Sequence, residues 1–124
     1  MNLRTIRRTA AALLAVSVMQ GVAMAHAFLD HAEPRVGWKT DASPREVKIW
    51  FSAPVEPAFS VVEVFAADGR QVDKKDTHGD PTDKTLLTVS IPVLPAGTYR
   101  VAWKVVATDT HKTRGEYKFT VKGA

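Results

Sequence analysis

The sequence predicts an all-β protein, a Greek-key sandwich of about seven strands in a single domain. Three observations predict this fold class. Short stretches alternate between apolar and polar residues with a period of two, as strands with one buried face require. Turn residues such as Gly, Pro and Asp separate these stretches. No stretch after residue 25 shows the longer apolar period of an amphipathic helix.

Residues 1–25 have the pattern of a secretory signal peptide. The segment carries three positive charges, from Arg4, Arg7 and Arg8. A short apolar run follows at residues 10–19, and small residues precede a cleavage point after Ala25. The run is shorter than the roughly 20 residues of a membrane-spanning helix, so a retained anchor is the less favoured alternative. The paired arginines also suggest twin-arginine export, but the expected apolar pattern does not follow them. We therefore expect general secretion, cleavage that makes His26 the first residue, and a periplasmic protein.

Removal of residues 1–25 changes the charge and the ligand chemistry of the chain. The whole sequence carries +4, but three of its 17 basic residues and none of its 13 acidic ones lie in this segment, which leaves +1. This balance does not indicate a basic patch for nucleic acid, and we expect no such partner. The chain has no cysteine, and its three methionines all lie at or before residue 24. Residues 26–124 therefore offer neither a disulfide nor a sulfur ligand.

The first part of the predicted sandwich is built from short strands. The candidates are an edge strand at 26–31 that ends near Pro34, strands at 46–52, 59–65 and 85–91, and a polar loop or poorly paired edge at 73–84. A turn at Asp68-Gly69 closes the third of them. In the second, the alternation assigns three side chains to one face: Val47, Ile49 and Phe51.

The last two predicted strands, residues 97–107 and 115–122, show the clearest alternation. One face of the first carries Tyr99, Val101, Trp103 and Val105, and one face of the second carries Tyr117, Phe119 and Val121. The stretch from Pro95 to Tyr99 resembles a tyrosine corner, a feature of Greek-key sandwiches of the immunoglobulin or cupredoxin-like type. We expect Tyr99 and Trp103 to be core residues rather than ligands.

Of the four histidines, His26 has a special position because cleavage after Ala25 would make it N-terminal. Its imidazole Nδ1 and the new amine can then chelate one metal ion in a six-membered ring. The amine is ordinarily protonated, with a pKa of about 7.7–8.0, so a metal must displace a proton. Binding should accordingly weaken as the pH falls.

A second pair of donors lies between the last two predicted strands, at Asp109 and His111. Residues two apart in an extended segment point to the same side, so a carboxylate and an imidazole converge. The alternative is an Asx-type turn with an exposed histidine. With His26, the pair completes a set of three nitrogens and one oxygen, which suits tetragonal Cu(II). Zn(II), which prefers tetrahedral sites, and Ni(II) are lesser competitors.

Residues 95–115 read PAGTYRVAWKVVATDTHKTRG. This stretch resembles the pattern P-A-G-T-Y-x-V-x-W-x-V-x-S-x-D-x-H-x-x-x-G of the CopC family, small periplasmic copper-binding β-sandwich proteins. The resemblance spans residues 26–124 and includes His26, Pro34 and the Ile49-Trp50-Phe51-Ser52 stretch. It implies one CopC-like domain with copper as Cu(II) bound by His26, Asp109 and His111, in which Asp109 is an axial or weakly bound ligand.

The sequence departs from the family pattern at three places. Some family members carry a Met-rich loop that binds Cu(I), but the corresponding residues 66–78 contain no methionine, so no Cu(I) site is carried over. Ala53 stands where some members have an acidic residue, and Thr108 replaces a serine. His31, which faces away from His26 unless a bulge turns it, and His78 in the polar loop are considered only as auxiliary ligands.

The resemblance implies a non-enzymatic carrier or sequestering protein for Cu(II) that acts in copper homeostasis or resistance. We expect a monomer whose partner is an inner-membrane copper transporter or another periplasmic copper protein. One alternative is a copper-dependent oxidative enzyme with an N-terminal histidine chelate, as in lytic polysaccharide monooxygenases. The small domain leaves little room for a polysaccharide-binding face, and a carboxylate ligand would crowd the oxygen position. The other alternative is a metal-free structural sandwich, whose melting temperature Cu(II) would not raise.

Overall fold

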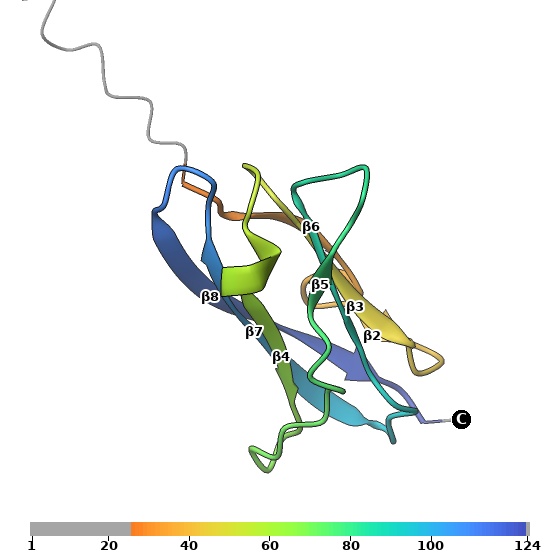
Figure 1. The fold of residues 1–124 in the computed structure, drawn as a ribbon. Coiled ribbons are helices and arrows are strands. Elements are labelled where there is room, and N and C mark those ends of the chain that lie inside the picture. The colour runs from red at the N-terminus through yellow and green to blue at the C-terminus, as the bar shows by residue number, and fades with distance from the viewer. Residues whose placement is uncertain (1–25, 124) are drawn as a thin grey trace, which may run out of the picture.

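The computed structural model describes residues 26–123, and these residues form two four-stranded β-sheets packed face to face (Figure 1). The all-β sandwich expected from the sequence is therefore confirmed. The predicted signal peptide, residues 1–25, lies outside the described residues. In the described part of the chain, no helix has the length and apolar character needed to cross a membrane.

Each sheet combines strands that are distant in the sequence. The first sheet has the order β1 (Leu29–Glu33), β3 (Glu46–Phe51), β6 (Leu86–Ser90) and β5 (His78–Gly79), with all neighbours antiparallel. The second has the order β2 (Lys39–Thr40), β8 (Lys112–Val121), β7 (Gly97–Val106) and β4 (Val61–Phe65), with β2 parallel to β8. A 3₁₀ helix, η3 (Pro57–Phe59), lies between β3 and β4. The chain thus changes sheets repeatedly, as in a Greek key.

The core lies between the sheets and contains the alternating apolar residues predicted from the sequence. All ten are buried: Val47, Ile49, Phe51, Tyr99, Val101, Trp103, Val105, Tyr117, Phe119 and Val121. Complete burial of one such side chain contributes roughly 1.5–3 kcal/mol. Across the core, the rings of Phe51 and Trp103 meet edge to face with their centroids 5.2 Å apart. This contact links β3 to β7.

The tyrosine corner is present at the start of β7. The Tyr99 hydroxyl donates a hydrogen bond of 2.7 Å to the backbone carbonyl of Pro95. The ring itself is buried and stacks against Phe119. Tyr99 therefore combines a core position with a polar tip that fixes the chain as it enters β7.

Gly115 on β8 leaves room for the indole of Trp103. The two residues are direct partners in the β7–β8 ladder. A Cβ atom at position 115 would lie 2.4 Å from Cζ2 of Trp103, closer than van der Waals contact permits. The packing of Trp103 thus explains why the 95–115 motif ends in a glycine.

Several predicted strand boundaries were wrong by a few residues. The first strand begins at Leu29 and not at residue 26, and β4 begins at Val61 because Pro57–Phe59 form η3. In contrast, β8 begins at Lys112, earlier than the predicted residue 115, because the β7–β8 hairpin is paired as far as Val106 and Lys112. The polar segment 73–84 is mostly loop and pairs only through β5, as expected for a poorly paired edge. The two-residue strand β2 was not predicted.

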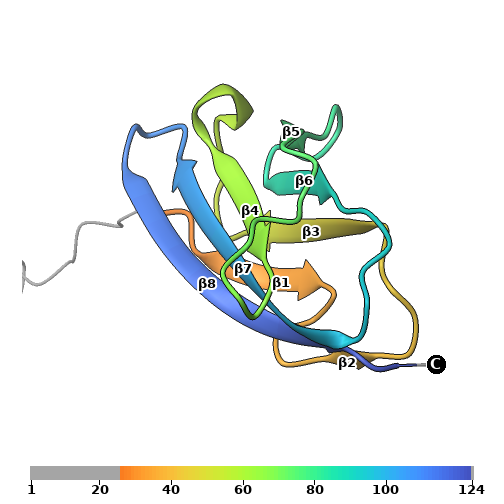
Figure 2. The ribbon, with the colours of Figure 1, turned by 90° about the horizontal axis from the view of Figure 1, so that it is seen from below.

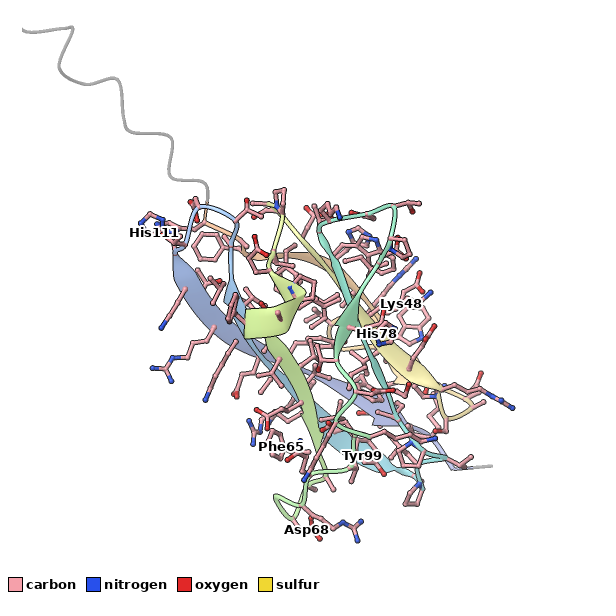
Figure 3. The ribbon with its side chains drawn as sticks, viewed as in Figure 1. Lys48, Phe65, Asp68, His78, Tyr99 and His111 are labelled. Carbon is pink, nitrogen blue, oxygen red and sulfur yellow. The ribbon has the colours of Figure 1, made fainter. Side chains whose placement is uncertain are left out.

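One end of the sandwich brings the start of the described chain next to the β7–β8 loop. Both ribbon views show this neighbourhood (Figures 1 and 2). His111 lies at this end, and the Asp68 turn lies at the opposite end (Figure 3). The fold therefore places the N-terminal segment and the Asp109–His111 loop side by side.

Candidate metal centre

The loop that carries Asp109 and His111 is a tight hairpin connection. The backbone N–H of Ala107 donates to the carbonyl of His111 (2.9 Å), and the N–H of Thr110 donates to the carbonyl of Ala107 (2.8 Å). Thr110 has φ of 75°, a left-handed conformation that is uncommon for a β-branched residue. The segment is therefore a turn, and the extended conformation assumed from the sequence was wrong.

The turn nevertheless brings the side chains of Asp109 and His111 together. The His111 N–H donates to Asp109 Oδ1 (3.1 Å), which is the Asx-type turn considered as the alternative. The other carboxylate oxygen, Oδ2, lies 3.2 Å from His111 Nδ1. The backbone N–H of His111, together with the nearby imidazole rings, holds the pKa of Asp109 below its ordinary value. Asp109 is therefore a carboxylate at neutral pH, and it can accept hydrogen bonds or bind a cation.

The imidazole of His26 stands against that of His111. The ring centroids are 4.6 Å apart and the rings are nearly perpendicular, at 89°. Nδ1 of His26 is buried and has no hydrogen-bond partner among the described residues. An unpartnered buried nitrogen is unfavourable by about 1–3 kcal/mol and calls for an explanation. A lone pair on this nitrogen is the kind of donor that a late transition-metal ion accepts.

Two hydroxyl side chains hold the N-terminal segment in place. Ser52 Oγ donates to the carbonyl of His26 (3.1 Å) and accepts from the N–H of Phe28 (3.0 Å). The Ser52 N–H also donates to the carbonyl of Phe28 (2.7 Å). On the other side, Thr113 Oγ1 donates to the carbonyl of Ala27, whose side chain is fully buried. We call Ser52 and Thr113 the hydroxyl clip.

Sequence reasoning missed the role of the hydroxyl clip. Ser52 belongs to the Phe-Ser stretch quoted for the family resemblance, so a signal for it was present. Thr113 falls at a variable position between His111 and Gly115 in the motif, and nothing in the sequence distinguishes it from other strand threonines. Only the packing of β8 against the first residues of the domain reveals its contact.

The other two histidines are engaged elsewhere. A bulge interrupts the β1–β3 pairing between Leu29 and His31, but the His31 ring stacks on Trp50 at 4.4 Å, and its Nδ1 lies 2.7 Å from Asp30 Oδ2. His78 lies on β5, at the opposite edge of the sheet from β1, and its Nδ1 donates to the carbonyl of Asp76. The structure gives neither histidine a contact with the pair formed by His26 and His111.

Within residues 26–123, no three His, Asp or Glu side chains converge in an arrangement ready to hold a metal ion. His111 directs Nδ1 to Asp109, and His26 meets the His111 ring edge to face. In the 124-residue chain the nitrogen of His26 is also an amide, so the expected amine ligand does not exist before cleavage. The structure places His111 in contact with both His26 and Asp109. Their coordination of a metal stays a prediction.

Known proteins resemble the whole described domain. A family model of the CopC domain matches residues 29–122. Protein YobA of Escherichia coli strain K12 is 34% identical over 116 residues, which cover 93% of this chain and 94% of that protein. The match to the family begins after His26, so it supports the domain and says nothing of the first ligand.

Two crystal structures also resemble the fold. CopC from Methylosinus trichosporium OB3b has a TM-score of 0.75 and 35% identity, and the match covers 79% of this chain and 95% of CopC. PcoC from Escherichia coli, described as a methionine-rich copper resistance protein, has a TM-score of 0.67 and 30% identity over 79% of this chain and all of PcoC.

Proposed function

This chain belongs to the CopC family, and we propose that it is a periplasmic Cu(II) carrier or sequestering protein in copper homeostasis. Its family and its copper-resistance relatives make it a copper-handling protein and not an enzyme, which removes the oxidative-enzyme alternative. The proposal adds the oxidation state, the ligands and the compartment.

The proposed ligands are the amine and imidazole of His26 together with His111 and Asp109. The observation that carries the proposal is the 4.6 Å separation of the His26 and His111 rings, beside the carboxylate of Asp109. The unpartnered Nδ1 of His26 adds a nitrogen that the protein itself leaves unused. Once residues 1–25 are removed, the amine of His26 lies next to this nitrogen in the same residue.

The donor atoms favour Cu(II) over Cu(I). Imidazole, amine and carboxylate suit the oxidised ion, whereas Cu(I) prefers thiolate and thioether ligands. Residues 26–124 contain neither cysteine nor methionine. PcoC is described as methionine-rich, and this chain differs from it in that respect. We therefore propose one Cu(II) site and no Cu(I) site.

Asp109 is well placed to orient His111 as well as to contact the metal. A metal-binding histidine commonly donates its second ring N–H to a carboxylate, which fixes the ring and raises its basicity. The contact between Asp109 Oδ2 and His111 Nδ1 has this form, and it leaves Nε2 of His111 for the ion. Asp109 can thus stabilise bound copper through His111 even when its own bond to the ion is weak.

The exposure of the site supports transfer to a partner. The His111 side chain keeps 54% of its surface exposed, and it stands on a loop at the end of the sandwich. An ion bound there can be reached by the ligands of another protein without unfolding of the core. An inner-membrane copper transporter or another periplasmic copper protein is the kind of partner we propose.

Electron paramagnetic resonance of residues 26–124 with one equivalent of Cu(II) tests the proposal. We expect a tetragonal signal with couplings to several nitrogens. The matched control retains Ala25 before His26, which blocks the amine but keeps every side chain. This control should bind copper more weakly and with fewer nitrogen couplings, and equal binding by the two proteins would rule out the amine as a ligand.

A further inference from the structure

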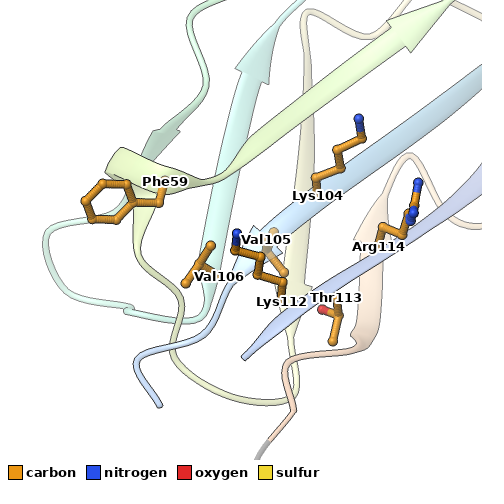
Figure 4. A pocket seen from close by; sticks show the side chains of 7 residues that line it. All are labelled: Phe59, Lys104, Val105, Val106, Lys112, Thr113 and Arg114. Carbon is orange, nitrogen blue, oxygen red and sulfur yellow. The ribbon is translucent and has the colours of Figure 1, made fainter. Parts of the chain in front are cut away.

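The outer face of β7 and β8 contains a groove (Figure 4). The groove has a volume of about 470 Å³. Seven residues line it: Phe59, Lys104, Val105, Val106, Lys112, Thr113 and Arg114. Three of them are cationic, and the side chain of Val105 belongs to the core beneath. We call Lys104, Lys112 and Arg114 the basic triad.

The strand register places two members of the basic triad directly opposite each other. Lys104 on β7 is the ladder partner of Arg114 on β8. Like charges in directly opposed positions destabilise an antiparallel pair. The fold thus retains an unfavourable pair at this place, although either position could carry a neutral residue at the solvent face.

No described carboxylate lies within ion-pair distance of the basic triad. Three of the other eleven lysines and arginines in the described residues do have such partners. The pairs are Lys48 with Glu46, Arg100 with Glu116, and Lys122 with Asp41. Residues 26–124 carry a net charge of only +1, so the triad is a local concentration of charge and not a consequence of a basic protein.

The side chains that line the groove suit an extended acidic polypeptide. Phe59 stands at its border on η3 and is 74% exposed, so its ring is free to contact a bound segment. An extended segment can place carboxylates on the basic triad and an apolar side chain against Phe59 and Val106. The guanidinium of Arg114 suits carboxylates in particular, because its planar fork donates two parallel hydrogen bonds.

The groove and the candidate metal centre share the beginning of β8. Lys112 directly follows His111, and Thr113 belongs both to the groove and to the hydroxyl clip on Ala27. A segment bound in the groove would therefore lie beside the exposed ring of His111.

We propose that the basic triad and Phe59 form a docking groove for an acidic segment of a protein partner. In combination with the proposed function, that partner is the protein that exchanges copper with this one. The docking itself requires no metal, so it can be tested separately.

The test is a nuclear magnetic resonance titration of isotope-labelled, copper-free residues 26–124 with an acetylated peptide of alternating glutamate and valine. We expect shift changes that cluster on Phe59, Lys104 and residues 112–114, and an affinity that falls with rising salt. In the double variant Lys104→Glu/Arg114→Glu, the affinity should fall about tenfold or more because attraction becomes repulsion.

A matched control makes the same change of charge elsewhere, in Arg45→Glu/Lys74→Glu, and should bind the peptide like the parent protein. The neutral variant Lys104→Gln/Arg114→Gln replaces the acidic one if that fails to fold. Three results would overturn the proposal: no binding of the peptide, shifts outside the groove, or equal loss in the control. Binding to vesicles of phosphatidylglycerol and phosphatidylcholine without binding to the peptide would assign the face to a membrane instead. If the peptide docks but Cu(II) gives no tetragonal signal, docking stands and the proposed function fails.

Discussion

The imidazole rings of His26 and His111 meet edge to face at 4.6 Å, although they come from the first residue of the described domain and from its last hairpin. Two separate sets of local contacts position these rings. The β7–β8 turn sets the direction of His111, and the hydroxyl clip fixes the carbonyls of residues 26 and 27. Under the proposed function, metal affinity and the local structure of the N-terminal segment are therefore coupled.

His111→Ala should abolish most Cu(II) binding and leave the fold intact. The side chain is exposed and contributes no core packing, whereas its nitrogen is one of the proposed ligands. A competition titration with a copper chelator measures the affinity, and thermal unfolding of the copper-free protein measures stability. His78→Ala removes an exposed histidine on β5 and should change neither quantity. Loss of folded structure in His111→Ala would instead assign the residue a structural role.

Asp109→Ala and Asp109→Asn should differ in their effect on copper. Alanine removes both the acceptor for the His111 N–H and the group that contacts Nδ1. We expect an affinity loss of roughly 10–100-fold, as for other groups that orient a ligand. Asparagine keeps an oxygen acceptor at the same place and should lose less. Equal losses would indicate that the negative charge, through direct coordination, matters more than the orientation of His111.

Ser52→Ala should loosen the N-terminal segment. It removes the hydrogen bonds of Oγ to the carbonyl of His26 and from the N–H of Phe28, each worth about 1 kcal/mol. We expect a decrease of about 1–2 kcal/mol in the free energy of unfolding, measured by denaturant titration, and a weaker Cu(II) affinity. Ser43→Ala is the comparison, since Ser43 Oγ accepts from the Leu94 N–H in a different loop. That variant should lose stability without a change in copper affinity.

Gly115→Ala should destabilise the domain through Trp103. The new methyl group would lie 2.4 Å from the indole, which must shift within a packed core at a cost of about 1–3 kcal/mol. Thermal or denaturant unfolding measures the loss, and the near-ultraviolet dichroism of the indole reports its displacement. Gly123→Ala, where a Cβ atom would have ordinary contacts, should leave both unchanged. An unaltered stability in Gly115→Ala would show that the indole has space to move.

The core residues could be predicted from the sequence because an apolar period of two identifies the buried face of a strand by itself. The alternation at Tyr99, Val101 and Trp103 predicts their burial without knowledge of the partner strand. The tyrosine corner was also predictable, because its hydrogen bond to Pro95 is local in the chain. These features depend on short-range patterns, which a single sequence displays.

The parts that the sequence did not predict depend on contacts between distant segments. The start of β1 was placed too early because side-chain hydrogen bonds from Ser52 and Thr113, and not a strand ladder, hold residues 26 and 27. The pairing of Asp109 with His111 was expected from an extended segment, yet it arises from a turn with Thr110 in a left-handed conformation. The basic triad is invisible in the sequence because only the β7–β8 register brings Lys104 opposite Arg114.

The hydroxyl clip acts entirely on the carboxyl side of the bond between residues 25 and 26. Its acceptors and donors are the carbonyls of His26 and Ala27 and the backbone of Phe28, and it makes no use of the His26 nitrogen. Cutting that bond would therefore break none of these contacts. Under the proposed function, the cleavage that removes residues 1–25 also creates the amine ligand of the copper site. Under the same proposal, the uncleaved chain has only side-chain ligands to offer and binds copper more weakly.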